Sequence, residues 1–260
     1  MPDQPFQRIR FEAQDRLAVV TLDRPDRRNA LDSLTLAELR AAIARCDADR
    51  GIGALLLRGE GPDFCAGADL GELRATVESA DDAANRADAM ALGDLLIAMR
   101  EARLPIIAAV HGHALAGGAG LATAADLIVA SASAVFGYPE IHLGFVPAMV
   151  TVPLRRAVGE KKAFELITLG RRFDAAEAQR MGLVARVFED DVFAEASLAF
   201  GRELAGRSAS ALELCKRMLY GIDGMTFDQA ILHGADINVL ARATDDFREG
   251  VRRFLERKAR

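Results

Sequence analysis

Short apolar runs separated by polar turns fill the first half of the chain. Residues 6–13 and 16–22 alternate apolar and polar side chains around a turn at 14–15, which predicts a β-hairpin. Residues 54–57, 106–110 and 127–130 are continuous apolar runs, which are typical of strands buried on both faces. The sequence therefore predicts a sheet whose inner strands are covered on two sides.

Helical spacing of apolar residues appears between and after these strands. It predicts helices over residues 33–48 and 86–103, and after residue 147 over 150–157, 161–169, 175–181, 192–205, 209–221 and from 227 to the end. The polar stretch 70–84 is expected to be irregular. Strands alternating with helices favour an α/β fold with parallel strands. We expect a core domain over residues 1–200 and a helical C-terminal region over 201–260.

The predicted C-terminal helices carry apolar residues on several faces, including Phe227, Ile231, Leu240 and Phe254. Such helices need cover from their own core or from a neighbouring subunit, and we favour the neighbour.

Composition narrows the class of protein. A net charge of -5 gives no electrostatic reason to expect a nucleic-acid or membrane partner. Three dispersed cysteines indicate a reducing compartment, and no apolar run resembles a signal peptide or a membrane span. We expect a soluble, cytoplasmic protein.

The glycine-rich segment GHALAGGAG, residues 112–120, has the strongest chemical signature. It follows a predicted buried strand and opens a short helix, so its bare N–H groups suit a negatively charged atom. Apart from His113, no side chain in this segment can handle a proton. If it forms part of a site, it stabilises an anion and the acid or base lies elsewhere.

A second loop, FCAGADL at residues 64–70, also follows a predicted strand. Taken alone it is best explained as a tight turn with Asp69 capping a helix. The functional alternative is a second set of N–H donors that face Gly117, since two donors on one carbonyl form an oxyanion hole.

Glu140 is the candidate acid or base. It follows a short predicted strand and a proline, and Phe136, Ile141 and Leu143 flank it. Most glutamates are solvated surface residues, but partial burial would tune this carboxylate for proton transfer.

The remaining candidates favour structural explanations. His111 and His113 show no third ligand at metal spacing, so we predict no metal site. Cys65 has no base paired with it in the sequence and is best explained as a small core residue. The patterns of P-loop proteins, zinc proteases and serine hydrolases are absent.

The motifs together resemble the crotonase superfamily, the enoyl-CoA hydratases and isomerases. The resemblance covers nearly the whole chain and rests on the order and spacing of NALD (29–32), FCAGADL (64–70), GHALAGG (112–118), FGYPE (136–140), LGFVP (143–147), RFDAAEA (172–178), MGLV (181–184) and TDDFREGV (244–251). It implies a spiral of ββα units with a C-terminal helical region, and homotrimers or dimers of trimers.

The resemblance also implies an acyl-CoA thioester as substrate, with coenzyme A as part of the substrate and no separate cofactor. The N–H groups of Ala68 and Gly117 would hold the thioester oxygen, and Glu140 would move the proton. Further substrate-binding positions are implied at Arg27, Arg28, Ala66, Gly67, Asp69, Leu70, Gly118 and Tyr138.

Gly120 departs from the family pattern, because hydratases with two acids carry a glutamate there. This glycine and the segment FVPAMV (145–150), which replaces a glycine-rich run of the family, resemble the branch around methylglutaconyl-CoA hydratases. We expect an enoyl-CoA hydratase of fatty acid metabolism with one glutamate. A Δ3,Δ2-enoyl-CoA isomerase and a catalytically silent acyl-CoA-binding protein remain alternatives, and the sequence does not identify the acyl group.

Overall fold

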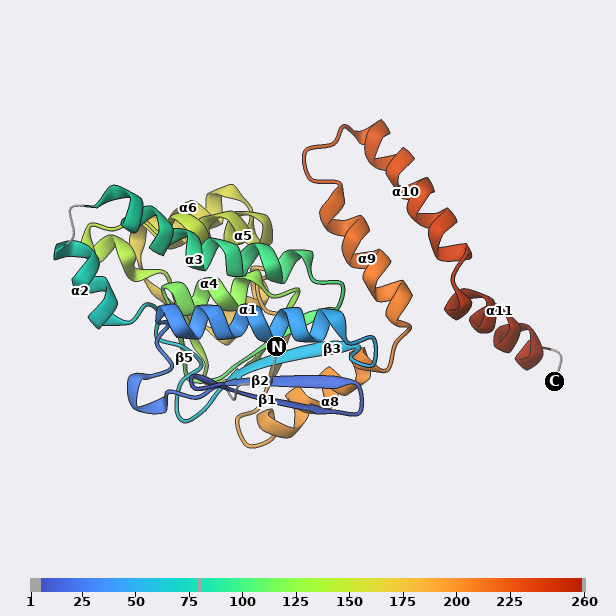
Figure 1. The fold of residues 1–260 in the computed structure, drawn as a ribbon, viewed down its shortest axis with the longest axis horizontal. Helices are drawn as coiled ribbons and strands as arrows, with labels where there is room; N and C mark the ends of the chain where they lie inside the picture. The colour runs from blue at the N-terminus through green and yellow to red at the C-terminus, as the bar shows by residue number, and fades with distance from the viewer. Residues whose placement is uncertain (1–5, 79–80, 259–260) are drawn as a thin grey trace.

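The main sheet has six strands in the order β1-β2-β3-β4-β6-β9 in the computed structural model, which describes residues 6–78 and 81–258 (Figure 1). The strands are β1 (Ile9–Gln14), β2 (Leu17–Leu22), β3 (Ala54–Gly59), β4 (Ile106–Val110), β6 (Leu127–Ser131) and β9 (Arg186–Phe188). The β1–β2 pair is antiparallel and every other pair in this sheet is parallel. The predicted hairpin and the three buried strands are confirmed.

Alternate residues of the central strands face two separate cores. Leu55 and Leu57 on β3 belong to a core shared with helices α1 (Ser33–Ala48), α3 (Asp82–Glu101) and α4 (Gly117–Ala124). Leu56, between them, faces a second core that includes Phe193 of α8 (Phe193–Ala205). Because both faces are covered, these strands need apolar residues at every position, which explains the continuous runs in the sequence.

A second sheet has three short strands in the order β5-β7-β8. They are β5 (His113–Leu115), β7 (Val135–Gly137) and β8 (Arg172–Asp174), with β5 parallel to β7 and β8 antiparallel to β7. The strand β5 leads directly into α4, and β7 leads into the short 3-10 helix η2 (Pro139–Leu143). Since β5 and β7 are parallel, their carboxyl ends bring the starts of α4 and η2 to one edge of this sheet.

One region differs from the sequence prediction. The prediction that residues 70–84 are irregular is wrong, because α2 (Leu70–Glu78) and the start of α3 lie there. Residues 79–80 of this stretch fall outside the described residues. The Asp81 side chain caps α3 by accepting hydrogen bonds from the N–H groups of Ala83 and Ala84. The helical segment expected from residue 227 to the end consists of α10 (Phe227–Arg242) and α11 (Asp245–Lys258).

The described residues of the core contain four further short or medium helices. They are η1 (Pro25–Arg27), α5 (Ala148–Val158), α6 (Glu160–Leu169) and α7 (Ala175–Arg180). The domain boundary predicted at 200/201 falls inside α8, whose last residue Ala205 is buried against the main sheet. We define the C-terminal arm as the helices that follow α8, namely α9 (Ala209–Gly221), α10 and α11.

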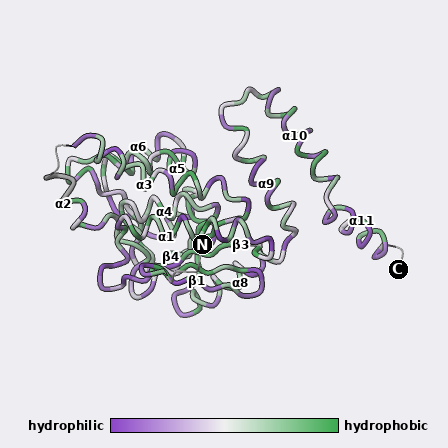
Figure 2. Tube along the Cα trace, in the orientation of Figure 1, coloured by the Kyte–Doolittle hydropathy of each residue, from purple (hydrophilic) through white to green (hydrophobic). Residues whose placement is uncertain are grey.

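The C-terminal arm extends away from the core (Figure 1), and apolar residues occur along its whole length (Figure 2). Its exposed large apolar side chains are Leu219, Met225, Phe227, Ile231, Leu232, Val239, Leu240, Phe247, Val251, Phe254 and Leu255. None of the helices in the described ranges is both long and apolar enough to cross a membrane.

A buried lysine attaches the arm to the core. The Lys216 ammonium donates to the main-chain oxygens of Met99 (2.8 Å) and Leu104 (3.1 Å) and forms an ion pair of 2.8 Å with Asp126. The Asp126 carboxylate also accepts hydrogen bonds from the Tyr220 hydroxyl (2.6 Å) and from a main-chain N–H of β4. Burial lowers the pKa of Lys216, so the ion pair compensates for a real cost of desolvation.

Replacing Lys216 by methionine is expected to lower the free energy of unfolding by about 3 kcal/mol, because it leaves Asp126 buried without its countercharge. Arg207→Met is the control, since Arg207 forms an exposed i,i+4 pair with Glu203 and should contribute less than about 0.5 kcal/mol. Urea unfolding measures both variants. Equal, small losses would contradict the anchoring role of Lys216.

Candidate active site

Two loops, residues 64–69 and 112–117, lie side by side between the main sheet and the small sheet. Short parallel bridges join Cys65 to Ala114 and Leu31 to Ala68. The Cys65 N–H donates to the His113 oxygen, and the Leu115 N–H donates to the Cys65 oxygen, both at 3.0 Å. The loop 64–69 therefore runs alongside the segment 112–117 and is held in register with it.

The N–H of Ala68 faces away from its bridging partner. The Leu31 N–H donates to the Gly67 oxygen (2.8 Å), and the Asp69 N–H donates to the Leu31 oxygen (2.9 Å). In such a parallel bridge the intervening residue directs its own N–H to the other side. Within residues 6–78 and 81–258, the Ala68 N–H has no protein acceptor.

The N–H of Gly117 is the second donor. Gly117 is the first residue of α4, where helix geometry leaves the N–H without an intrahelical partner, and the dipole favours negative charge. A β-carbon added at Gly117 would lie 3.8 Å from the Ala68 nitrogen, and one added at Gly67 would lie 3.5 Å from the Gly117 nitrogen. Two unused donors from separate loops thus lie side by side, which is the arrangement of an oxyanion hole.

Local backbone strain accompanies this arrangement. Ala116, directly before α4, has φ 50° and ψ -124°, a combination that costs energy for any residue with a β-carbon. Gly67 has φ +107°, and a β-carbon on it would lie 2.9 Å from that of Ala116. A β-carbon on Gly118 would lie 2.3 Å from the Cys65 oxygen. The glycines allow the two loops to approach this closely.

Glu140 lies in η2, at the same edge of the small sheet. The strand before it pairs with β5, and the Ala116 N–H donates to the Gly137 oxygen (2.9 Å). Most of the Glu140 carboxyl is buried, and its Oε2 has no hydrogen-bond partner among the described residues. Burial raises the pKa of this carboxyl above the ordinary value of a glutamate. A partly buried carboxyl with one unpaired oxygen is suited to accept a proton from a substrate or a water molecule.

Tyr138 supports the Glu140 turn from within the core. Its side chain is fully buried, and its hydroxyl lies 2.7 Å from that of Thr123, which donates to the Ala119 oxygen (2.7 Å). This chain of hydrogen bonds joins the turn to α4. The tyrosine has no exposed surface, so it cannot contact a substrate directly. It can affect substrate binding only by holding Glu140 in position.

The position where two-acid relatives would carry a second glutamate has no space for a side chain. A β-carbon added at Gly120 would lie 1.8 Å from Cγ1 of Val150, which projects from α5. Gly120 and Val150 are both buried, so an apolar contact between α4 and α5 fills this place. The Val150 side chain thus fills the space that a side chain at position 120 would need.

Replacing Gly120 by alanine is expected to lower the free energy of unfolding by about 1–3 kcal/mol, because the added methyl overlaps Val150. The double variant with Val150→Ala should lose less than the sum of the two single variants, since the valine makes room. Chemical unfolding of the three variants gives the coupling energy. Additive losses would contradict the direct contact.

The other predicted binding residues surround the two loops. The Ala66 N–H donates to the Arg28 oxygen (3.0 Å), and the Arg28 and Arg27 side chains are exposed beside it. The Asp69 carboxylate pairs with Arg24 (2.9 Å) and accepts from the Gly71 N–H (2.9 Å), so its oxygens are already engaged. Leu70 begins α2 and is 77% exposed.

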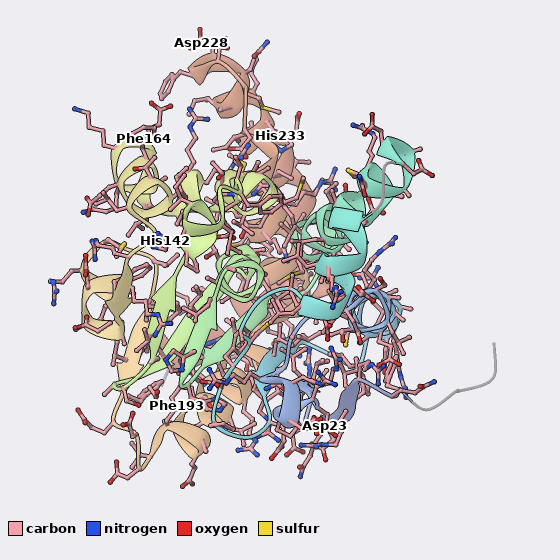
Figure 3. All side chains as sticks on the ribbon, turned by 90° about the vertical axis from the view of Figure 1, so that its left-hand side faces the viewer. Asp23, His142, Phe164, Phe193, Asp228 and His233 are labelled. Carbon is pink, nitrogen blue, oxygen red and sulfur yellow. The ribbon has the colours of Figure 1, made fainter. Side chains whose placement is uncertain are left out.

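The histidines take separate places. His111 Nε2 lies 2.8 Å from the Gly61 oxygen, and His142 Nε2 lies 3.2 Å from the Gly170 oxygen, where α6 meets the small sheet (Figure 3). His113 pairs with Asp63 at 2.6 Å. No group of three or more potential metal ligands (His, Cys, Asp or Glu) occurs in the described ranges.

Sequence reasoning missed several supporting residues. Thr123, Val150 and Asp63 are ordinary residues in unremarkable local sequence, and each acts on a segment far away in the chain. The burial of Cys65, by contrast, was expected, and desolvation raises its thiol pKa to about 12, which leaves it unreactive at neutral pH.

A cavity of about 560 Å³ lies at the opposite end of α4. Residues of α3, α5 and the start of β6 line it, with Arg100, Arg156 and Tyr220 at one side. None of Ala68, Gly117 and Glu140 lines this cavity, so it is separate from these three candidate site residues.

Comparison with known proteins identifies relatives of this chain. Residues 12–260 match the family model described as enoyl-CoA hydratase/isomerase. The chain is 39% identical to a putative enoyl-CoA hydratase of Thermus thermophilus over 93% of this chain and 95% of that protein. It is 34% identical to the 2,3-dehydroadipyl-CoA hydratase of Escherichia coli over 94% of each. The crystal structure of a putative enoyl-CoA hydratase from Streptomyces coelicolor superposes with a TM-score of 0.94 at 34% identity, covering 99% of this chain and 94% of that one.

Proposed function

Because the chain belongs to the enoyl-CoA hydratase/isomerase family, we propose that it adds water across the 2,3 double bond of an enoyl-CoA thioester. The observation that carries this proposal is the pair of unused N–H donors at Ala68 and Gly117, on the same edge of the small sheet as the buried carboxyl of Glu140. This set supplies an oxyanion hole and one base, which are the groups that the reaction needs.

The N–H donors stabilise the charge that develops during the addition. The thioester oxygen would lie between the nitrogens of Ala68 and Gly117, where it gains negative charge as the thioester becomes an enolate. Each preorganised donor can contribute about 2.7–4 kcal/mol to the stabilisation of such a transition state. Strain at Ala116 is consistent with donors that are fixed before the substrate arrives.

Glu140 carries the proton in both steps. Its carboxylate accepts a proton from water while the water oxygen forms a bond to the β-carbon, and the π electrons move onto the thioester oxygen. The enolate then collapses, and the α-carbon takes the same proton from Glu140. The product is a 3-hydroxyacyl-CoA, the carboxylate is regenerated, and no oxidant, metal or separate cofactor takes part.

A Δ3,Δ2-enoyl-CoA isomerase is the second candidate, favoured by the single carboxylate. Val150 fills the space beside Gly120, and Glu140 is the candidate acid that η2 brings to this edge of the small sheet. In an isomerase it would remove a proton from one carbon and return it two carbons away. Both reactions use the same oxyanion hole, so an assay must distinguish them.

The test compares a short 2-enoyl-CoA with its 3-enoyl isomer, together with a panel of branched and dicarboxylic 2-enoyl-CoAs. Absorbance follows the conjugated thioester, and mass spectrometry identifies the product. We expect loss of conjugation with gain of one water from at least one 2-enoyl substrate. Bond migration without gain of water would identify an isomerase, and binding without any reaction would identify a silent acyl-CoA binder. The panel also identifies the acyl group, and with it any kinship to methylglutaconyl-CoA hydratases or a place in fatty acid breakdown.

The activity should fall in acid with a midpoint above 4.5, the ordinary pKa of a glutamate. Burial raises the pKa of Glu140, and only the deprotonated carboxylate can accept a proton from water, so kcat/KM is lost as the pH drops through this pKa. A pH profile of kcat/KM measures it, with circular dichroism to confirm that the protein stays folded. A plateau that continues down to pH 4.5 would contradict this assignment.

We further propose that the protein assembles as a homotrimer or a dimer of trimers in the cytoplasm. The C-terminal arm exposes many large apolar side chains, and the core exposes others. Among these are Phe145, which follows η2, and Phe164 of α6, labelled in Figure 3. Isolated apolar surfaces of this extent favour contact with a second copy. Light scattering coupled to size exclusion tests the assembly, and a monomer at micromolar concentration would contradict it.

A further inference from the structure

A buried carboxylate outside the proton chemistry holds the two loops of the oxyanion hole together. Asp63 is 5% exposed, and one of its oxygens, Oδ1, accepts two hydrogen bonds from His113. The main-chain N–H of His113 donates at 3.0 Å, and Nδ1 of its ring lies at 2.6 Å. Asp63 lies on the Ala68 loop and His113 on the strand that leads to Gly117.

This side-chain contact extends a short ladder of main-chain hydrogen bonds. The Phe64 N–H donates to the His111 oxygen (3.0 Å), and the bonds between Cys65 and the segment 113–115 follow in order. The ladder leads directly to the two donors of the oxyanion hole. Because Asp63 lies at its start, it fixes how the loop that carries Ala68 sits along the strand that leads to Gly117.

The surroundings of Asp63 leave it little freedom to move. Its main-chain oxygen accepts from the Asn29 amide (2.8 Å), and Asn29 is itself buried. A β-carbon on Gly112, next to His113, would lie 1.9 Å from the Pro62 oxygen and 2.9 Å from Asp63 Oδ1. The Arg28 guanidinium lies 3.8 Å from Oδ2, so the second oxygen also faces a cation.

We propose that Asp63 and His113 are positioning residues for the reaction, acting through the separation of the Ala68 and Gly117 N–H groups. The inference rests on the proposed function, because it assigns the pair a role in the oxyanion hole of that reaction. Displacing a reacting group by about 1 Å can cost on the order of 100-fold in rate. The rate is therefore expected to depend on this contact more steeply than substrate binding does.

The matched control is Glu38, a second buried carboxylate that accepts two N–H bonds. Its oxygens accept from the main chain of Gln7 and Arg8, each at 2.8 Å, and join the N-terminal segment to α1. Asp63→Ala and Glu38→Ala each remove a carboxylate of this kind, so both should lower stability. Only the Asp63 variant should change the chemistry.

The experiment measures kcat and KM of the full chain on the best 2-enoyl-CoA, for Asp63→Ala, Asp63→Asn and Glu38→Ala. We expect Asp63→Ala to lower kcat by roughly 10–100-fold with a smaller change in KM. Asp63→Asn should recover most of the loss, because its amide oxygen can still accept both bonds. Glu38→Ala should keep kcat within about threefold of the wild type, well inside the effect of a displaced reacting group.

A second readout reports the oxyanion hole without turnover. Infrared difference spectra of bound butyryl-CoA, labelled with carbon-13 at the carbonyl, should show the thioester band moved to lower frequency by the two N–H donors. The move should be smaller in Asp63→Ala and unchanged in Glu38→Ala. If Asp63→Ala fails to fold, His113→Phe takes its place in the test, because it removes the bond from the histidine ring to Asp63. This variant should reduce both kcat and the shift of the carbonyl band.

The inference is overturned if Asp63→Ala, or His113→Phe in its place, retains the wild-type kcat and carbonyl band. It is equally overturned if Glu38→Ala lowers kcat as much as Asp63→Ala. A wild-type protein that turns over no enoyl-CoA, or that binds butyryl-CoA without moving the carbonyl band, would instead refute the proposed function.

Discussion

Replacing Glu140 by glutamine is expected to lower kcat by between about 100- and 10,000-fold, the usual contribution of a positioned general base. Glutamine keeps the size of the side chain but cannot accept the proton of water. Val150 occupies the place where a second acid would stand. The Asp69 carboxylate, next to Ala68, is engaged by Arg24 and by the Gly71 N–H. Steady-state kinetics on the best 2-enoyl-CoA measures the loss.

Binding of coenzyme A thioesters should survive this substitution, because the N–H donors of Ala68 and Gly117 are untouched. Calorimetry with butyryl-CoA therefore provides the control, and a dissociation constant within about threefold of wild type, less than 1 kcal/mol, is expected. An unchanged kcat in Glu140→Gln would show that a different group is the base. A lost affinity would instead show that Glu140 acts in binding.

Replacing Gly67 by alanine is expected to lower kcat by roughly 100-fold. The new β-carbon would lie 2.9 Å from that of Ala116 and 3.0 Å from the Leu115 oxygen, and φ at this position is +107°. The loop must shift to relieve both contacts, and it carries the adjacent N–H of Ala68 away from that of Gly117. Removing one donor of an oxyanion hole costs about 100- to 1,000-fold, so a displaced donor should approach that loss.

Gly224→Ala is the control that separates the effect of a positive φ from the effect of the β-carbon contacts. Gly224 also has a left-handed φ of +81°, but a β-carbon there would meet nothing within 4 Å. It lies between α9 and α10, in the C-terminal arm. Both variants place a β-carbon at a residue with positive φ, and only Gly67→Ala should lose activity. Similar kcat values for the two variants would contradict the geometry of the hole.

The local sequence predicted those parts of the site that are set by the conformation and close approach of the main chain. Glycines mark positions where a side chain would collide, so the close approach at Gly67 and Gly118 is visible in the sequence as a residue type. The buried strands before both loops are visible as apolar runs. The partial burial of Glu140 followed from its apolar neighbours. The family resemblance then assigned expected roles to these positions, and the family model confirms the family itself.

Contacts between distant segments could not be predicted in this way. Val150 faces Gly120 because α5 packs on α4, and nothing in either segment indicates the pairing. The Tyr138 hydroxyl is satisfied by Thr123, fifteen positions before it in the chain, and the tyrosine, expected at a substrate-binding position, is fully buried. The helix α2 was missed because its sequence is polar, and tertiary context overrides such patterns.

The central claim is that one carboxylate and two N–H groups add water to an enoyl-CoA. Turnover of the best 2-enoyl-CoA in water enriched in oxygen-18, followed by mass spectrometry of the intact thioester, tests it most directly. The claim predicts a 3-hydroxyacyl-CoA that carries one oxygen-18 atom, formed by the wild type and only at a trace rate by Glu140→Gln. A product without the heavy oxygen, or equal labelling by both proteins, would contradict it.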